Sequence, residues 1–359
     1  MTAFVHTTHA QRVFFGTGDG PRHLGAEVER LGAERIMLIA ADQETSLAAE
    51  VIATVPVTRR WNDVAPHVPI ATAQAATAAA RNDAIDLMIS VGGGSTTGLA
   101  KAIALETGIP IVAVPTTYAG SEATNVWGLT ENSRKTTGVN DVVLPVSIVY
   151  DARLTASLPV ELSVVSGLNA LAHCIDSMWA PRTDPIDKAL AGEGIAVLAR
   201  ALPEIRNDAG QTLAGREDAL YGAYLSAVTF ASAGSGLHHK ICHVLGGAYN
   251  LPHAHTHAIV LAYVTAFLAP FAQDAERRIA SAFDATDALT GLNDLRAAVG
   301  APTALRDHGF DGSVISEAAH LILPSVPPGT PRPVTADDLE VLLRAAWAGD
   351  PPTKEMFRS

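Results

Sequence analysis

A glycine-rich turn at the end of an apolar run constrains the fold of this chain more than any other feature. The run Leu87–Val91 passes directly into Gly92-Gly93-Gly94-Ser95, and a helical pattern containing Lys101 follows. A continuous apolar run is typical of a strand buried on both faces of a parallel sheet. Glycines let a phosphate approach the backbone, and a helix N-terminus favours an anion. We therefore predict a dinucleotide phosphate site at Gly92, Gly93, Gly94 and Ser95, with a plain tight turn as the alternative.

Similar apolar runs recur through the first 150 or so residues. The others are Arg12–Phe15, Arg35–Ala40, Pro110–Val114 and Val146–Tyr150. Helical patterns separate them, at Pro21–Leu31, Pro69–Arg81 and Thr96–Glu106. Alternating strands and helices predict an α/β domain with a parallel sheet that binds a dinucleotide.

The pattern changes after Asp151. Long segments rich in Ala and Leu follow, at Pro159–Met178, Pro185–Arg206, Arg216–Ala233, Ser235–Gly246 and Pro252–Ala272. They predict an all-α domain. The 359 residues exceed the usual size of a single core. We therefore predict an α/β domain over residues 1–154 and an all-helical substrate domain over 155–359.

Composition and charge exclude several classes of partner. The formal net charge is −12, and no basic run offsets it, so nucleic acid and anionic membrane surfaces are not expected partners. No apolar run reaches the roughly 20 residues that cross a bilayer, and the N-terminus lacks a secretory signal. Only two cysteines, Cys174 and Cys242, are present, which suits a reducing cytoplasm.

Two further segments fit the cofactor site, because ligands bind at the carboxyl ends of parallel strands. The run Pro110–Val114 ends in Pro115-Thr116-Thr117-Tyr118, which places Thr116 and Thr117 there. Asp42 follows the run Arg35–Ala40, where a carboxylate can accept hydrogen bonds from a ribose and repel a 2′-phosphate. A capped loop and a helix N-cap, respectively, are the structural alternatives.

Six of the thirteen histidines lie between positions 238 and 257. His239 and His243 are four residues apart and share a helix face, and Pro252 and His253 open the next helix. So many histidines in an apolar helical domain indicate a catalytic or metal-binding role for at least two of them. His255 and His257 are expected at the surface or behind the site. Upstream, Asn169 and His173 are also four residues apart, and a self-satisfied buried pair is their alternative.

Together these residues resemble the iron-containing (group III) alcohol dehydrogenases, which are related in fold to glycerol dehydrogenase and dehydroquinate synthase. The resemblance spans essentially the whole chain. It implies that Gly92–Ser95 hold the cofactor pyrophosphate and that Thr116 and Thr117 line the cofactor cleft. The family's metal is held by an Asp and three His, at positions that correspond to Asn169, His173, His239 and His253 here. His243 corresponds to a histidine that faces nicotinamide and substrate.

Within that family the segments at 92–99, 115–122 and 236–249 are most similar to the maleylacetate reductase branch. Gly98 and Asn169 stand where metal-dependent relatives carry acids. The branch implies NAD(P)H-dependent conversion of maleylacetate to 3-oxoadipate in aromatic-compound catabolism, with His243 as first choice for the acid and His173, His239 and His253 as further donors. Asn169, Lys240 and Tyr118 are expected to bind the small dicarboxylate substrate.

The sequence and its resemblance also predict the cofactor, the metal content and the assembly of the protein. NADH is expected, with NADPH as an alternative. Because Asn169 is a neutral, weak ligand, no bound metal is expected. Relatives often form dimers, and Arg12–Phe15 is a plausible edge strand for pairing in a homodimer. The alternative functions are a metal-dependent alcohol or polyol dehydrogenase, a lyase that recycles NAD internally, and a non-enzymatic metal-binding protein.

Overall fold

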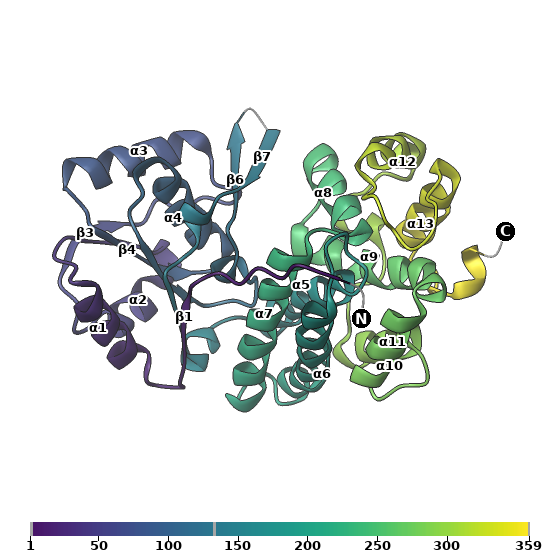
Figure 1. Ribbon diagram of the computed structural model, residues 1–359, viewed down its shortest axis with the longest axis horizontal. Coiled ribbons are helices and arrows are strands. Elements are labelled where there is room, and N and C mark those ends of the chain that lie inside the picture. The colour runs from purple at the N-terminus through teal and green to yellow at the C-terminus, as the bar shows by residue number, and fades with distance from the viewer. Residues whose placement is uncertain (1–2, 132–133, 358–359) are drawn as a thin grey trace. The chain divides into compact units, whose positions relative to one another are not determined.

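The computed structural model describes residues 3–131 and 134–357, and Figure 1 labels its elements. The chain forms two compact units. The α/β unit consists of residues 8–159 together with 210–220. The described part of the helical unit consists of residues 3–7, 160–209 and 221–357.

A six-stranded parallel sheet forms the centre of the α/β unit. Its strand order is β1-β8-β5-β4-β2-β3, and all five strand pairs are parallel. The strands are β1 (Arg12–Phe15), β2 (Ile36–Ile39), β3 (Val57–Trp61), β4 (Leu87–Gly92), β5 (Ile111–Pro115) and β8 (Ser147–Tyr150). Every residue of β2, β4, β5 and β8 is buried, as their apolar sequences require.

Helices cover both faces of this sheet. Side chains of α1 (Gly20–Leu31) and α2 (Thr45–Val51) pack with alternate strand residues such as Leu38 and Ile89 in one core. Side chains of α3 (Ile70–Asn82) and α4 (Gly94–Thr107) pack with Met37 and Met88 in the other. A hairpin of β6 (Val126–Glu131) and β7 (Arg134–Val139) forms a separate antiparallel pair. The sheet is therefore doubly wound, which brings the loops after its strands to one edge.

The helical unit is built almost entirely of α-helices. They are α5 (Val160–Ser177), α6 (Pro185–Asn207), α8 (Leu237–Tyr249), α9 (His253–Leu268), α10 (Gln273–Ala282), α11 (Ala288–Val299), α12 (Ile315–Ile322) and α13 (Ala336–Ala348). One more helix, α7 (Ala214–Ala233), begins in the α/β unit and ends in the helical unit. Its first residues are held by Arg216, which is 1% exposed and donates hydrogen bonds to the carbonyls of Thr155 and Leu158.

One segment of the described chain is apolar and long enough to span a membrane by composition. It runs from His253 to Phe271, with a mean hydropathy of 1.4. Within the helical unit, every residue of α9 from Thr256 to Leu268 is buried. Its apolar composition is therefore that of a buried core helix.

The predicted fold class is confirmed, an α/β unit with a parallel sheet and a helical unit. The sequence patterns missed β3 and the β6–β7 hairpin. In β3 the middle residues Thr58, Arg59 and Arg60 are exposed at an edge of the sheet, so no apolar run marks the strand. In β6 no residue is fully buried, and the same signal is absent.

Candidate active site

The glycine turn between β4 and α4 has the geometry of an anion site. Gly92 has φ of 152°, and a Cβ atom there would lie 2.4 Å from Thr96 Oγ1, so the turn requires glycine. Gly93 precedes the first turn of α4, and Gly94 is exposed there. The first backbone N–H groups of a helix have no partner within the helix and attract phosphate.

Thr116 and Thr117 lie beside this turn, in the same unit. The N–H of Thr116 donates to the carbonyl of Gly92 at 3.2 Å. A Cβ atom on Gly93 would lie 3.0 Å from Thr117 Cγ2. Thr116 also donates to Glu44 Oε1 at 3.3 Å, and burial raises the pKa of that carboxyl. Glu44 was not predicted, because nothing in its local sequence indicates this contact.

Asp42 lies just past the carboxyl end of β2 and is exposed. Its Oδ1 atom accepts a hydrogen bond from Asn62 Nδ2 at 2.7 Å. Its side chain caps neither the short helix Asp42–Glu44 nor α2. The carboxylate is therefore oriented by Asn62 and is not used as a helix cap.

Tyr118 lies in the α/β unit and is fully buried. Its hydroxyl is 3.5 Å from both Thr155 Oγ1 and a guanidinium nitrogen of Arg216. The nearby Lys101 is also fully buried, and its ammonium donates to the carbonyls of Ser121, Thr124 and Val126. Burial lowers the pKa of Lys101 to about 7. These contacts shape the loop that follows Thr116 and Thr117.

In the helical unit, histidines from three helices form one cluster. His173 comes from α5, His238, His239 and His243 from α8, and His253 and His257 from α9. The ring of His239 lies 4.8 Å from that of His173, 4.9 Å from that of His257 and 6.1 Å from that of His243. The rings of His253 and His257 are 4.3 Å apart. The structure thus brings together all four histidines that were predicted to be catalytic.

Burial varies across this histidine cluster. His238, His239 and His257 are buried, His173 is partly buried, and His243 and His253 are exposed. Burial lowers the pKa of His173 to about 4 and lowers the pKa values of His238, His239 and His257 well below the usual range. His257 is therefore a core residue of the cluster. Only His243 and His253 present imidazoles at its exposed edge.

A carboxylate that the sequence did not point to lies behind the cluster. Asp176 is fully buried on α5, and its Oδ2 atom lies 2.7 Å from His239 Nδ1. The same carboxylate accepts hydrogen bonds from the N–H groups of Gly236 and His238. Burial raises the pKa of Asp176. Asp176 therefore fixes the ring orientation of His239.

The residues of the cluster fit a divalent transition metal. His239 Nε2, His257 Nε2 and Asn169 Oδ1 are buried without a hydrogen-bond partner. A histidine whose other nitrogen is held by a carboxylate is a typical metal ligand, and His239 with Asp176 has this arrangement. A second set, His238, Cys242 and His257, has ligand atoms within 4.8 Å of one another. Imidazole and thiolate are the ligands that zinc and iron prefer.

The two other predicted substrate residues also lie in the helical unit. Asn169 is 5% exposed, one helical turn before His173 on α5. Lys240 is partly buried on α8, next to His239. Both therefore share helices with the histidine cluster, whereas Tyr118 belongs to the other unit.

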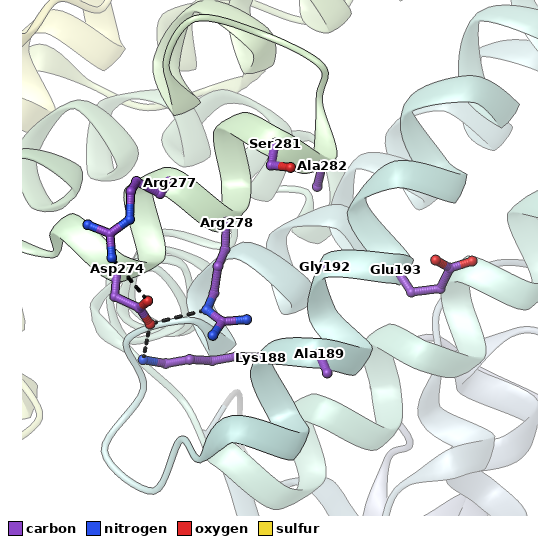
Figure 2. Close-up of a pocket in the computed structure, with 9 residues that line it drawn as sticks. All are labelled: Lys188, Ala189, Gly192, Glu193, Asp274, Arg277, Arg278, Ser281 and Ala282. Atoms are coloured by element: carbon purple, nitrogen blue, oxygen red, sulfur yellow. Dashed lines mark hydrogen bonds and ion pairs between the residues drawn. The ribbon is translucent and has the colours of Figure 1, made fainter. Parts of the chain in front are cut away.

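A pocket of about 490 Å³ lies between α6 and α10, away from the predicted residues (Figure 2). Asp274 forms ion pairs there with Lys188, Arg277 and Arg278, as the dashed lines show. None of the predicted site residues lines it. We therefore assign this pocket no part in the chemistry.

Comparisons with known proteins agree with this geometry. A family model described as iron-containing alcohol dehydrogenase matches residues 10–152, and one for the C-terminal part of the Fe-containing alcohol dehydrogenase family matches 163–347. The solved structure of an iron-containing alcohol dehydrogenase from Corynebacterium glutamicum is 56% identical, with a TM-score of 0.97 and 99% of each chain covered.

Two similar proteins carry a more specific name. A maleylacetate reductase from Sphingobium indicum is 42% identical over 97% of this chain and 99% of its own length. The solved structure of maleylacetate reductase from Rhizobium sp. strain MTP-10005 is 40% identical, with a TM-score of 0.92, 98% of this chain covered and 100% of that chain.

These findings correct the expectation that no metal is bound. The matching families are described by the iron that they contain, and the described residues include the ligand group His238, Cys242 and His257. The expectation was wrong because it rested on Asn169 as a neutral, weak ligand and included no carboxylate elsewhere in the cluster. Asp176, two turns further along α5, places a carboxylate against His239 that the local sequence did not indicate.

Proposed function

Because the chain belongs to the iron-containing alcohol dehydrogenase family, we propose that it is an NAD(P)H-dependent oxidoreductase that reduces the carbon–carbon double bond of maleylacetate to give 3-oxoadipate. The observation that carries this proposal is the 40–42% identity, over nearly the full length, to proteins named maleylacetate reductase. The exposed His243, at the edge of the histidine cluster, would supply the acid group that the reaction needs.

The reaction itself defines what the site must supply. Maleylacetate carries a double bond conjugated to a ketone, with a carboxylate at each end. A bound nicotinamide would supply a hydride to the alkene carbon remote from the ketone, and the ketone oxygen would then carry negative charge as an enolate. A proton then goes to the carbon next to the ketone. The site needs a donor at the enolate oxygen, a proton source and groups that bind two carboxylates.

We assign the cofactor to the loops at the carboxyl ends of the strands. The helix N-terminus at Gly93, Gly94 and Ser95 would receive the pyrophosphate, and Gly92 makes the turn possible. Thr116 and Thr117 lie beside it. The exposed carboxylate of Asp42 would accept from the adenosine ribose, which favours NADH over NADPH.

We assign proton transfer to His243, at the exposed edge of the histidine cluster. His243 and His253 are exposed, and their rings are 6.5 Å apart. An exposed imidazole can exchange protons with water and pass one to substrate. The rings of His173 and His239 stay neutral, because burial lowers their pKa values, so they are poor proton donors but are able to bind a metal ion.

We assign the metal to His239, His173 and His253, with Asn169 Oδ1 beside them. This set includes exposed and partly buried rings that substrate can reach, whereas His238, Cys242 and His257 are all buried. A bound divalent ion supplies Lewis-acid stabilisation of negative charge on an oxygen. Asp176 holds His239 in the orientation that leaves Nε2 available.

We also propose which residues bind the substrate, where in the cell the enzyme acts and how it assembles. Asn169 and Lys240 would bind carboxylate or ketone oxygens beside the histidines. The buried Tyr118 would hold the loop of the α/β unit in place through Thr155 and Arg216. The enzyme would be cytoplasmic and serve aromatic-compound catabolism. Strand β1 lies at an edge of the sheet, so it can pair with a second copy in a homodimer.

An absorbance assay of NADH consumption tests the function. Maleylacetate should be reduced far faster than simple aldehydes or ketones, and 3-oxoadipate should form in equal amount. The alternative is a metal-dependent alcohol or polyol dehydrogenase. It is favoured by the 56% identity to a structure titled iron-containing alcohol dehydrogenase. Oxidation of simple alcohols, with maleylacetate inert, would establish that alternative.

A further inference from the structure

A second group of ligand atoms lies at the start of the chain. His6 Nδ1 is 2.7 Å from Asp184 Oδ2 and 3.8 Å from Asp187 Oδ1. Ser232 Oγ is 3.4 Å from His6 Nδ1 and 3.3 Å from Asp187 Oδ2. All four residues belong to the helical unit, and none is part of the histidine cluster. The N-terminal segment thus meets the first turn of α6 and the end of α7.

This group is buried, and one of its oxygens lacks a partner. The side chain of Asp187 is fully buried, that of Asp184 is 2% exposed, and that of His6 is 10% exposed. Asp187 Oδ1 has no hydrogen-bond donor. A buried carboxylate without full pairing is costly, so the geometry indicates a positive group that the described side chains do not supply.

We propose that His6, Asp184 and Asp187 bind a divalent transition metal ion, with zinc as the preferred occupant. One neutral imidazole and two carboxylates are a suitable ligand set, and the ion's two charges balance the two carboxylates. Zinc–ligand bonds of about 2.0–2.1 Å place tetrahedral ligand atoms roughly 3.3 Å apart. The 2.7 and 3.8 Å separations bracket that spacing. Ser232 Oγ or water would complete the coordination.

The competing occupant is a proton. Burial raises the pKa of Asp187, and a protonated Asp187 with an ion pair between His6 and Asp184 would leave the group neutral without metal. Metal binding and proton binding differ in stoichiometry, which can be measured directly. Because the proposed function places another metal ion at the histidine cluster, the measurement must compare variants of the intact enzyme.

The test uses His6→Gln and Asp187→Asn. Asp184 is left unchanged because its Oδ1 atom caps the N-terminus of α6. His9→Gln is the matched control, because His9 is another histidine of the N-terminal segment, lying 3.7 Å from the exposed Asp141 and outside the group. Each purified enzyme is titrated with ZnCl₂ by calorimetry and with Co²⁺ by visible absorption, and its total metal is determined by mass spectrometry.

The parent enzyme and His9→Gln should bind one more Zn²⁺ per chain than His6→Gln and Asp187→Asn. Reductase activity should be unchanged in all of them, because the site lies outside the catalytic residues. Circular dichroism and the melting temperature establish that each variant is folded. Equal metal content and equal titration end points in the parent and both variants would overturn the proposal and leave a proton-bound ion pair.

Discussion

Asp176 Oδ2 lies 2.7 Å from His239 Nδ1, and both residues are buried. The contact joins α5 to α8 and leaves His239 Nε2 as the nitrogen that faces the rest of the cluster. Asp176 also accepts hydrogen bonds from backbone N–H groups at the start of α8. The carboxylate therefore orients both the imidazole and the helix that carries it.

Replacing Asp176 by Asn should weaken metal binding while keeping a side chain of the same size between α5 and α8. Loss of such a carboxylate behind a ligating histidine typically reduces metal affinity or activity about 10–100-fold. We expect a parallel drop in metal content and in kcat/KM with maleylacetate. Added metal should restore part of the activity. Parent metal content together with lost activity would instead assign Asp176 a role in folding or chemistry alone.

His243→Ala should reduce turnover and leave NADH binding unchanged. A general acid contributes roughly 10²–10⁴-fold to rate, and His243 is on the exposed edge of the cluster. The measurements are kcat across the pH range and NADH affinity by fluorescence titration. His255→Ala is the control, because His255 pairs with His308 outside the cluster. Parent turnover in His243→Ala would exclude His243 as the acid.

Gly93→Val should block the cofactor. A Cβ atom at Gly93 already lies 3.0 Å from Thr117 Cγ2, and the two further methyl groups would occupy the space in front of the helix N-terminus. NADH affinity should fall at least tenfold, about 1.4 kcal/mol, with the melting temperature of the free enzyme little changed. A variant that binds NADH like the parent would place the pyrophosphate elsewhere.

Asp42→Ser should shift the cofactor preference toward NADPH. The exposed carboxylate repels a 2′-phosphate, and a serine hydroxyl can still bond a ribose. We expect the ratio of kcat/KM for NADPH to that for NADH to rise about tenfold, or ~1.4 kcal/mol. Asp63→Ser, another acidic position next to Asn62, is the control. An unchanged ratio would show that the ribose does not reach Asp42.

Acid should destabilise the protein below about pH 6.5. Burial lowers the pKa of His173 to about 4 and those of His238 and His257 well below the usual range. Between pH 6.5 and 4 the unfolded chain therefore binds protons that the native state does not, so the free energy of unfolding decreases as pH falls. The raised pKa of Asp176 acts in the opposite direction and offsets part of the loss.

Calorimetric melting temperatures at pH 7.5, 6.5, 5.5 and 4.5 measure this dependence. His257→Gln removes one of the titrating rings, so its melting temperature should depend less steeply on pH. A melting temperature that is constant across this range in the parent would mean that the buried histidines take up protons in the native state.

Sequence patterns predicted five of the six strands of the parallel sheet and the long helices, but not the contacts between them. Apolar runs such as Leu87–Val91 mark strands that are buried on both faces, whereas the exposed residues of β3 leave no such mark. The sequence predicts His257 at the surface or behind the site, and the structure buries it. The sequence alone does not show how α9 packs against α8, and this packing decides the burial of His257. The neutral side chain at Asn169 likewise says nothing about Asp176, whose carboxylate reaches His239 only through the packing of α5 against α8.

The residues at the ends of strands were easier to predict than those inside the helical unit. Topology alone brings Gly92 and Thr116 to the same edge of a parallel sheet, and they are joined by a hydrogen bond of 3.2 Å. No comparable rule indicates which face of α5 meets α8. Asp176, Glu44 and Arg216 are polar groups whose partners are distant in sequence, so only the folded chain identifies them.

Residues 210–220 belong to the α/β unit, although they follow a long part of the helical unit in the sequence. The chain passes from one unit to the other at 7/8, 159/160, 209/210 and 220/221. A fragment that ends at residue 159 would lack Arg216 and leave the carbonyls of Thr155 and Leu158 without its donors. No single cut yields two complete halves. Fragment complementation or domain shuffling would therefore have to carry the 210–220 segment along with residues 8–159 of the α/β unit.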